Sequence, residues 1–220
     1  MLHDPINDGN PDSGGFSDGR YDAVLFDFDG VLADTEPVHF ACWREILKPL
    51  GITITWENYQ PCIGMSERET LAYFGRLADP PLAHEDLWPL YPAKKAMFLE
   101  SVMSNLPIAP ATREFVKSLN GIGLAVVSSS ATPEIRPILE KTGLIGSFGA
   151  LVFAEDVGRH KPAPDPYLLA AEKLGAGKPL VVEDSEAGLA SGRAAGFDVL
   201  RVTDPALMPE LVRARLRFNL

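Results

Sequence analysis

Two carboxylates stand two residues apart after a short apolar segment, in Asp27-Phe28-Asp29-Gly30. Residues two apart on an extended chain point to the same side, so both acids are expected to face one site. Adjacent carboxylates repel each other unless a proton or a cation separates them. One acid can then act as a nucleophile and the other as a general acid and base. The alternative is a solvated Asp-Gly turn, which is common where a strand ends.

A run of three hydroxyls, Ser128-Ser129-Ser130, follows the apolar residues 123–127. Hydroxyl and backbone N–H groups that lead into a helix N-terminus can hold phosphate oxygens. The same residues could instead form a loop that only caps the helix. The sequence therefore indicates either an anion site or an ordinary helix start.

Lys161 lies in a proline-rich segment, HKPAPD, at 160–165. Because prolines restrict the backbone, this loop can hold the ammonium group in one place as a point charge for phosphate. The alternative is a surface lysine in a polar loop, which is the usual environment of this residue type.

Two further acids, Glu183 and Asp184, follow the apolar residues 180–182. Acids at the end of a buried strand are costly unless a cation or hydrogen-bond donors stabilise them. Mg²⁺ binds a few carboxylates, while water and substrate oxygens complete its octahedral shell. The alternative is that Asp184 or Ser185 caps the next helix, and the two roles are compatible.

The strands and helices that must position these side chains can be recognised from their patterns of apolar residues. Apolar segments typical of buried strands occur at 23–26, 123–127, 150–153, 180–182 and 198–202. Helical patterns lie between them, with expected N-caps at Thr132, Asp165 and Ser185. Buried strands that alternate with helices predict a Rossmann-like α/β fold, in which helices cover both faces of a parallel sheet.

Residues 35–107 interrupt this alternation, because they show almost wholly helical patterns and no convincing buried strand. The predicted helices are at 38–50, 67–77 and 93–103. An all-helical insert directly after the first strand would project from the sheet edge where ligands bind, and could act as a lid. We therefore expect a core of 20–34 and 108–220, a cap of 35–107, and a flexible extension at 1–19.

The composition excludes several classes of protein. The chain has 46% hydrophobic and 23% charged residues, which is ordinary for a soluble globular protein. Its formal net charge of -10, with no cluster of Lys and Arg, argues against nucleic acid as a partner. No apolar run is long enough to cross a bilayer and no secretory signal is recognisable, so we expect a cytoplasmic protein. We also expect a monomer or a weak dimer. Cys42 and Cys62 are expected to be small buried side chains.

Together the four polar segments resemble the haloacid dehalogenase superfamily, in its phosphatase and β-phosphoglucomutase branch with a helical C1 cap after the first strand. The resemblance covers residues 21–220 and is most specific in DFDGVLADTEP, KPAPDPY and VVEDSEAG. It implies a Mg²⁺-dependent phosphatase that acts on a small phosphorylated metabolite. Dehalogenases and phosphonate-cleaving members lack the second aspartate, so the presence of Asp29 disfavours those activities.

The same resemblance implies catalytic roles. Asp27 would be the nucleophile that becomes phosphorylated, and Asp29 would protonate the leaving group and then activate water. Ser128 and Lys161 would hold the transferring phosphoryl group, beside the further hydroxyl of Ser129. Lys161 would also keep Asp27 ionised. These roles agree with the chemistry of phosphoryl transfer, in which positioning and charge stabilisation supply most of the catalysis.

A Mg²⁺ site is implied as well. Asp27 and Asp184 would ligate the ion through their carboxylates, and Asp29 through its backbone carbonyl. Glu183 would ligate it directly or through water.

The start of the insert resembles the corresponding stretch of β-phosphoglucomutases, where a histidine and a tryptophan occupy the places of His39 and Trp43. These two are four residues apart and share a helix face, and Glu36 lies in the same stretch. We expect all three to contact substrate. The alternative is that Trp43 packs inside the cap and His39 is a partly exposed polar residue.

The cap loop at 62–68 departs from that pattern, with Ile63 at the usual lysine position and Glu67 at the usual arginine position. A mutase needs cations in the cap for a second phosphate, and Arg68 is the only evident candidate in this loop. The sequence therefore favours a phosphatase for a sugar phosphate or a phosphoglycolate-like acid. A β-phosphoglucomutase-type phosphomutase is the second hypothesis, and a non-catalytic protein of the same fold is the third.

Overall fold

The computed structural model describes residues 21–63 and 65–217, so the extension expected at 1–19 lies outside the described residues. A sheet of five parallel strands forms the centre, in the order β3-β2-β1-β4-β5. The strands are β1 (Ala23–Phe26), β2 (Gly123–Val127), β3 (Ala150–Val152), β4 (Pro179–Glu183) and β5 (Asp198–Arg201). The predicted Rossmann-like parallel sheet is confirmed, and no strand end differs from its predicted position by more than one residue.

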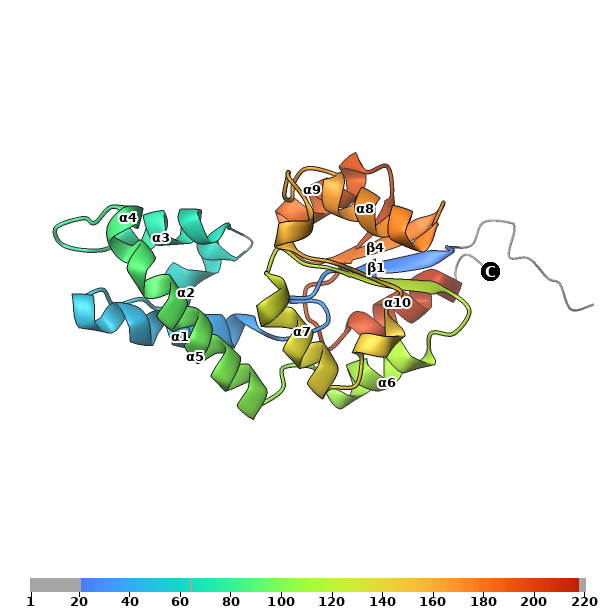
Figure 1. The fold of residues 1–220 in the computed structure, drawn as a ribbon, viewed down its shortest axis with the longest axis horizontal. Helices are drawn as coiled ribbons and strands as arrows, with labels where there is room; N and C mark the ends of the chain where they lie inside the picture. The colour runs from blue at the N-terminus through green and yellow to red at the C-terminus, as the bar shows by residue number, and fades with distance from the viewer. Residues whose placement is uncertain (1–20, 64, 218–220) are drawn as a thin grey trace, which may run out of the picture.

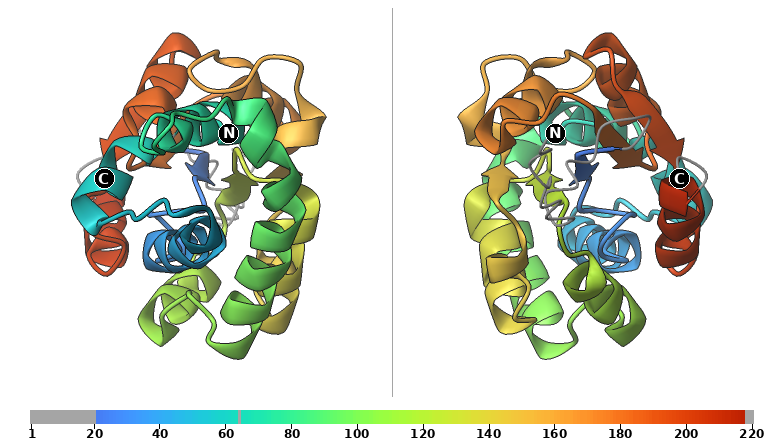
Figure 2. Two further views of the ribbon diagram at one scale, coloured as in Figure 1. Left: turned by 90° about the vertical axis from the view of Figure 1, so that its left-hand side faces the viewer. Right: turned by 90° about the vertical axis from the view of Figure 1, so that its right-hand side faces the viewer.

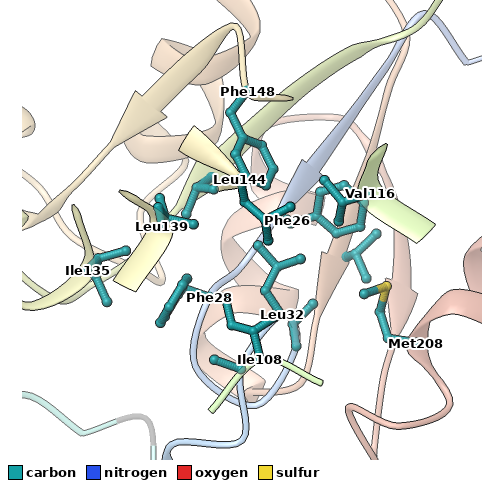
Figure 3. Close-up of a cluster of buried hydrophobic side chains, with 14 of the residues drawn as sticks. Phe26, Phe28, Leu32, Ile108, Val116, Ile135, Leu139, Leu144, Phe148 and Met208 are labelled. Atoms are coloured by element: carbon teal, nitrogen blue, oxygen red, sulfur yellow. The ribbon is translucent and has the colours of Figure 1, made fainter. Parts of the chain in front are cut away.

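Helices cover both faces of the sheet (Figure 1). One face carries α8 (Asp165–Leu174) and α9 (Glu186–Ala194), and the other carries α6 (Pro110–Ser118), α7 (Thr132–Lys141) and α10 (Met208–Arg217). Alternate side chains of a strand point to opposite faces. Val24 and Phe26 of β1 join the larger apolar cluster, which includes residues of α6, α7 and α10 (Figure 3), whereas Ala23 and Leu25 join the cluster under α8. Both faces of the strand are therefore buried.

Of the three predicted N-caps, one is confirmed and two are wrong. Ser185 caps α9 as expected, because its hydroxyl accepts a hydrogen bond from the Gly188 amide at 3.0 Å. The caps expected from Thr132 and Asp165 are wrong, since each is the first residue of its helix and neither helix has a side-chain cap. At the start of α7 the Thr132 amide donates a hydrogen bond to the Glu155 carboxylate at 3.0 Å, so a residue from another part of the chain caps this helix.

Residues between β1 and α6 form a helical insert beyond the carboxyl ends of the strands (Figure 1). Its helices are α1 (Glu36–Leu47), α2 (Trp56–Tyr59), α3 (Glu67–Gly75), α4 (His84–Leu87) and α5 (Tyr91–Ser104), joined in part by short 3₁₀ turns. The insert has an apolar cluster of its own, which includes Trp43, Leu71 and Phe74. The predicted helix starting at 93 begins two residues earlier, because Pro92 falls in the first turn, where proline is tolerated.

The two connections between insert and sheet lie side by side. The Asp34 amide donates to the Pro107 carbonyl at 3.0 Å. On one side of the molecule α5 runs beside α7 (Figure 2), and the Lys95 ammonium group of α5 lies 2.7 Å from the Glu134 carboxylate of α7. These contacts place the insert over the carboxyl edge of the sheet.

Cys42 and Cys62 are free and buried, as predicted. Among the helices of residues 21–63 and 65–217, none has the length and apolar character needed to cross a membrane.

Candidate active site

Phe28 explains why the two leading acids face the same way. Its ring is fully buried and lies near Leu32 and Ile108 in the large apolar cluster (Figure 3). Because Phe28 points into the core, Asp27 and Asp29 on either side of it turn toward the insert, and both line the cavity between insert and sheet.

Lys161 joins acids from two strand ends. Its ammonium nitrogen lies 2.6 Å from Asp27 Oδ1 and 2.6 Å from Glu183 Oε1, and it donates to the Val127 carbonyl at 2.9 Å. These bonds hold the side chain rigidly, with 5% of its surface exposed. Burial raises the pKa of Asp27 well above its usual range, and the charge of Lys161 opposes this rise.

Glu183 is surrounded by donors and has no exposed surface. Besides Lys161, the Tyr167 hydroxyl donates to Oε1 at 2.8 Å. The Asp184 amide donates to Oε2 at 3.0 Å, and the Ser185 amide and hydroxyl do so at 3.1 Å. Both carboxylate oxygens thus accept hydrogen bonds from the protein, and Glu183 holds the Lys161 ammonium group in position. Tyr167 is the last residue of the KPAPDPY segment, but it was not predicted as a site residue.

Asp29 is held by hydroxyls from both parts of the chain. Thr35 Oγ1 donates to Oδ1 at 2.6 Å, Ser130 Oγ donates to Oδ2 at 3.1 Å, and Ser128 Oγ lies 3.5 Å from Oδ2. Burial alone would raise the pKa of Asp29, but the nearby His39 imidazole and the hydroxyls of Thr35 and Ser130 lower it. Ser130 was missed as a site residue, although it belongs to the predicted hydroxyl run.

Asp27, Glu183 and Asp184 offer ligand atoms that lie within 4.8 Å of one another. Burial, and then the charges of Glu183 and Glu36, raise the pKa of Asp184 to about 7. The Asp184 carboxylate accepts no side-chain hydrogen bond from the described residues, and a Cβ atom at Gly30 would overlap it. A divalent cation beside Asp27 and Asp184 would relieve this repulsion, so the donor set fits Mg²⁺.

On the insert, a lysine that the sequence did not single out lies beside His39. Lys94 Nζ is 2.7 Å from His39 Nδ1, and His39 Nε2 is 3.8 Å from Asp29 Oδ1. The His39 ring stacks on Phe98 with centroids 4.1 Å apart. Trp43 is 3% exposed and packs in the cluster of the insert, while part of it also lines the cavity. Trp43 therefore packs inside the cap, and its contact with substrate stays a prediction.

The cavity has a volume of about 700 Å³. The predicted residues that line it are Asp27, Asp29, Glu36, His39, Trp43, Ser129, Lys161 and Asp184. The structure does not bring Arg68 into this group, because Arg68 is exposed on α3 and turned away from the lining. Ser128 and Glu183 lie behind the lining, in contact with the acids that form it.

Comparison with known proteins agrees with this geometry. A family model described as haloacid dehalogenase-like hydrolase matches residues 24–202. The chain belongs to this family. The predicted family and fold class are confirmed, and the helical insert of this haloacid dehalogenase-like hydrolase stands where the family's cap is expected.

Two curated relatives are phosphatases, in agreement with the predicted enzyme class. Fructose-1-phosphate phosphatase YqaB of Escherichia coli is 34% identical over 199 residues, which are 83% of this chain and 97% of that protein. A phosphorylated carbohydrates phosphatase of Thermotoga maritima is 33% identical over 180 residues, or 80% of this chain and 82% of that protein. Among solved structures, CbbY of Rhodobacter sphaeroides in complex with phosphate has a TM-score of 0.68 and 28% identity, covering 83% of this chain and 87% of that one.

Proposed function

We propose that this hydrolase removes phosphate from a small phosphate monoester in a Mg²⁺-dependent reaction, with a phosphoaspartate intermediate on Asp27. The observation that carries the proposal is the contact between Asp27 and Lys161 at 2.6 Å, on the wall of a cavity that Asp29 and Asp184 also line. A nucleophile, a fixed cation, a second acid and a metal ligand thus surround one reacting centre.

In the first step, Asp27 attacks phosphorus and the bond from phosphorus to the leaving oxygen breaks. Asp29 gives its proton to that oxygen. In the second step, Asp29 takes a proton from water, which attacks phosphorus, and the Asp27 carboxylate leaves. Lys161 and the hydroxyls of Ser128 and Ser129 would hold the phosphoryl oxygens as charge develops on them.

Mg²⁺ would be held by the carboxylates of Asp27 and Asp184 and the main-chain carbonyl of Asp29, and when bound it would neutralise phosphoryl oxygens. Both oxygens of Glu183 already accept protein donors. Glu183 would therefore reach the ion through water, as one of the two arrangements that the sequence allowed.

Residues 35–107 would act as a cap that excludes water from the cavity during the reaction. The substrate would be a sugar phosphate or a phosphoglycolate-like acid, and the two phosphatase relatives support the first class. Glu36, His39 and Trp43 line the cavity and would contact the leaving group. The phosphomutase alternative loses support because Arg68, its expected cation for a second phosphate, is exposed and lies outside the lining.

The test is phosphate release from a panel of phosphate monoesters with and without Mg²⁺, for the natural chain and for Asp27→Asn. The variant is expected to lose activity by at least about a thousandfold, since an amide is not a nucleophile here. Asp34→Asn is the matched control, because Asp34 is exposed in the same loop. Turnover that survives in Asp27→Asn, or that needs no divalent ion, would contradict the proposal.

A further inference from the structure

The cavity is acidic beyond the reaction centre. Besides Asp27, Asp29 and Asp184, five glutamates among the described residues line it, namely Glu36, Glu67, Glu69, Glu134 and Glu186. Glu134 pairs with Lys95 and Glu186 with Arg201, whereas no salt bridge is formed by Glu36, Glu67 or Glu69 among the described residues. The lysines of the described lining are Lys94 and Lys161, and none of the described lining residues is an arginine.

Both lysines of the described lining lie next to groups of the reaction centre. Lys161 is committed to Asp27 and Glu183. Lys94 is 4% exposed, its Nζ contacts His39 Nδ1, and it lies 5.3 Å from the centre of the Trp43 ring. The two lysine charges of the described lining therefore lie beside Asp27 and beside His39.

Two of the glutamates present hydrogen-bond acceptors to the cavity. The Tyr59 hydroxyl donates to Oε2 of Glu36, and the Tyr91 hydroxyl donates to Oε1 of Glu67. The other oxygen of each carboxylate, Oε1 of Glu36 and Oε2 of Glu67, accepts no hydrogen bond from the described residues. A ligand in this part of the cavity can bind these oxygens only by donating hydrogen bonds.

We infer that this side of the cavity selects the leaving group by charge, accepting neutral polyhydroxylated or amine-bearing groups and rejecting a carboxylate or a second phosphate. This inference rests on the proposed phosphatase function and narrows its substrate class. Hydroxyl and ammonium groups donate to Glu36 and Glu67, whereas an ionised acid only accepts and is repelled. Of the two proposed classes, sugar phosphates fit and phosphoglycolate-like acids do not.

The test compares kcat/KM in matched pairs of phosphate monoesters with Mg²⁺ present. Glycerol 3-phosphate and 3-phosphoglycerate differ by one carboxylate, and glucosamine 6-phosphate and glucose 6-phosphate differ by one amine. We expect the carboxylate to lower kcat/KM by about tenfold or more, and the amine to leave it equal or raise it. Equal or faster turnover of 3-phosphoglycerate relative to glycerol 3-phosphate would overturn the inference.

Substitutions of Glu36 and Glu67 test whether these two residues cause the charge preference. Glu67→Gln and Glu36→Gln, made separately in case one folds poorly, are each expected to raise the ratio of kcat/KM for 3-phosphoglycerate over glycerol 3-phosphate by about three- to tenfold. Glu45→Gln is the matched control, since Glu45 is an exposed acid of α1 outside the lining, and should leave that ratio unchanged. A purely structural role would lower both rates and leave the ratio fixed, which would contradict the inference.

A generic probe separates this inference from the function on which it rests. If p-nitrophenyl phosphate is hydrolysed but the charge preference is absent or reversed, only the inference is overturned. If neither p-nitrophenyl phosphate nor any pair member releases phosphate with Mg²⁺, the proposed function is wrong and the inference is wrong with it.

Discussion

The ammonium nitrogen of Lys161 lies 2.6 Å from Oε1 of Glu183, and the two side chains are 5% and 0% exposed. Lys161 comes from the loop after β3 and Glu183 from the end of β4, so their contact ties two strand ends together. The same lysine contacts Asp27. One cation thus balances two buried carboxylates, and the negative charge that remains favours a divalent ion beside them.

Replacing Glu183 with glutamine should destabilise the fold. The change leaves Lys161 with one counter-charge and puts an amide donor opposite the donors that now meet the carboxylate. We expect Glu183→Gln to lower the free energy of unfolding by about 2–4 kcal/mol, measured by urea denaturation. Glu186→Gln removes a neighbouring exposed carboxylate that pairs with Arg201 at 2.7 Å, and should cost less than about 1 kcal/mol. Equal small losses would mean that the buried contacts contribute little.

Stability without metal should depend on pH through Asp184. Its pKa is raised from 3.8 to about 7 in the folded chain, so as pH rises the unfolded chain releases this proton first. The free energy of unfolding should therefore fall between about pH 4 and pH 7, by up to about 4 kcal/mol from this group, and level off above. Melting curves in EDTA at pH 4.5 and 7.5 measure this fall. It should be smaller in Asp184→Asn.

Mg²⁺ should reverse that loss above pH 7, because the ion binds the ionised carboxylates. With free Mg²⁺ at about 100 times its dissociation constant, binding should add roughly 2.7 kcal/mol to the free energy of unfolding. The gain should shrink toward pH 5, where Asp184 is protonated, and be largely absent in Asp184→Asn. A pH-independent gain in both proteins would place the ion elsewhere.

The cap should influence the acid that serves the leaving group. His39 helps to lower the pKa of Asp29, so His39→Gln should raise that pKa. Because a general acid must carry its proton, the alkaline limb of the pH–rate profile should move to higher pH, and kcat/KM on that limb should rise relative to the natural chain. His84→Gln is the control, because His84 lies on α4 and pairs with Glu85 at 2.9 Å. A lower rate with an unmoved profile would mean that His39 acts only in packing.

Gly30 is predicted to be required for its lack of a side chain. Its φ of +76° disfavours other residues, and a Cβ atom there would overlap the Asp184 carboxylate. Gly51 has a similar φ of +73° with open space around the Cβ position. Gly51→Ala should therefore cost about 1 kcal/mol of stability. Gly30→Ala should cost more and also weaken Mg²⁺ binding, measured by titration of the ion against melting temperature. Equal effects of the two changes would contradict the role given to Asp184.

The strands and the four polar segments could be predicted because they depend on local patterns. Apolar runs such as Ala23–Phe26 are buried on both faces of a parallel sheet, and parallel strands bring their carboxyl ends to one edge. The acids and hydroxyls that follow those runs had to meet there. By contrast, the caps expected from Thr132 and Asp165 failed because each residue is the first of its helix. The Thr132 amide donates to Glu155 instead, and the Asp165 carboxylate accepts from Arg159.

What the sequence by itself determined was the parallel α/β sheet, the helical insert and the set of groups at the sheet edge, since each follows from the spacing of neighbouring residues. Only the tertiary structure decided which side chains of the insert reach the groups at the sheet edge. Lys94 contacts His39 across 55 positions of sequence, while Arg68 turns outward on α3. Packing against other helices sets how a helix is rotated about its axis. Neighbouring residues on a helix point about 100° apart, so Glu67 lines the cavity while Arg68 faces solvent.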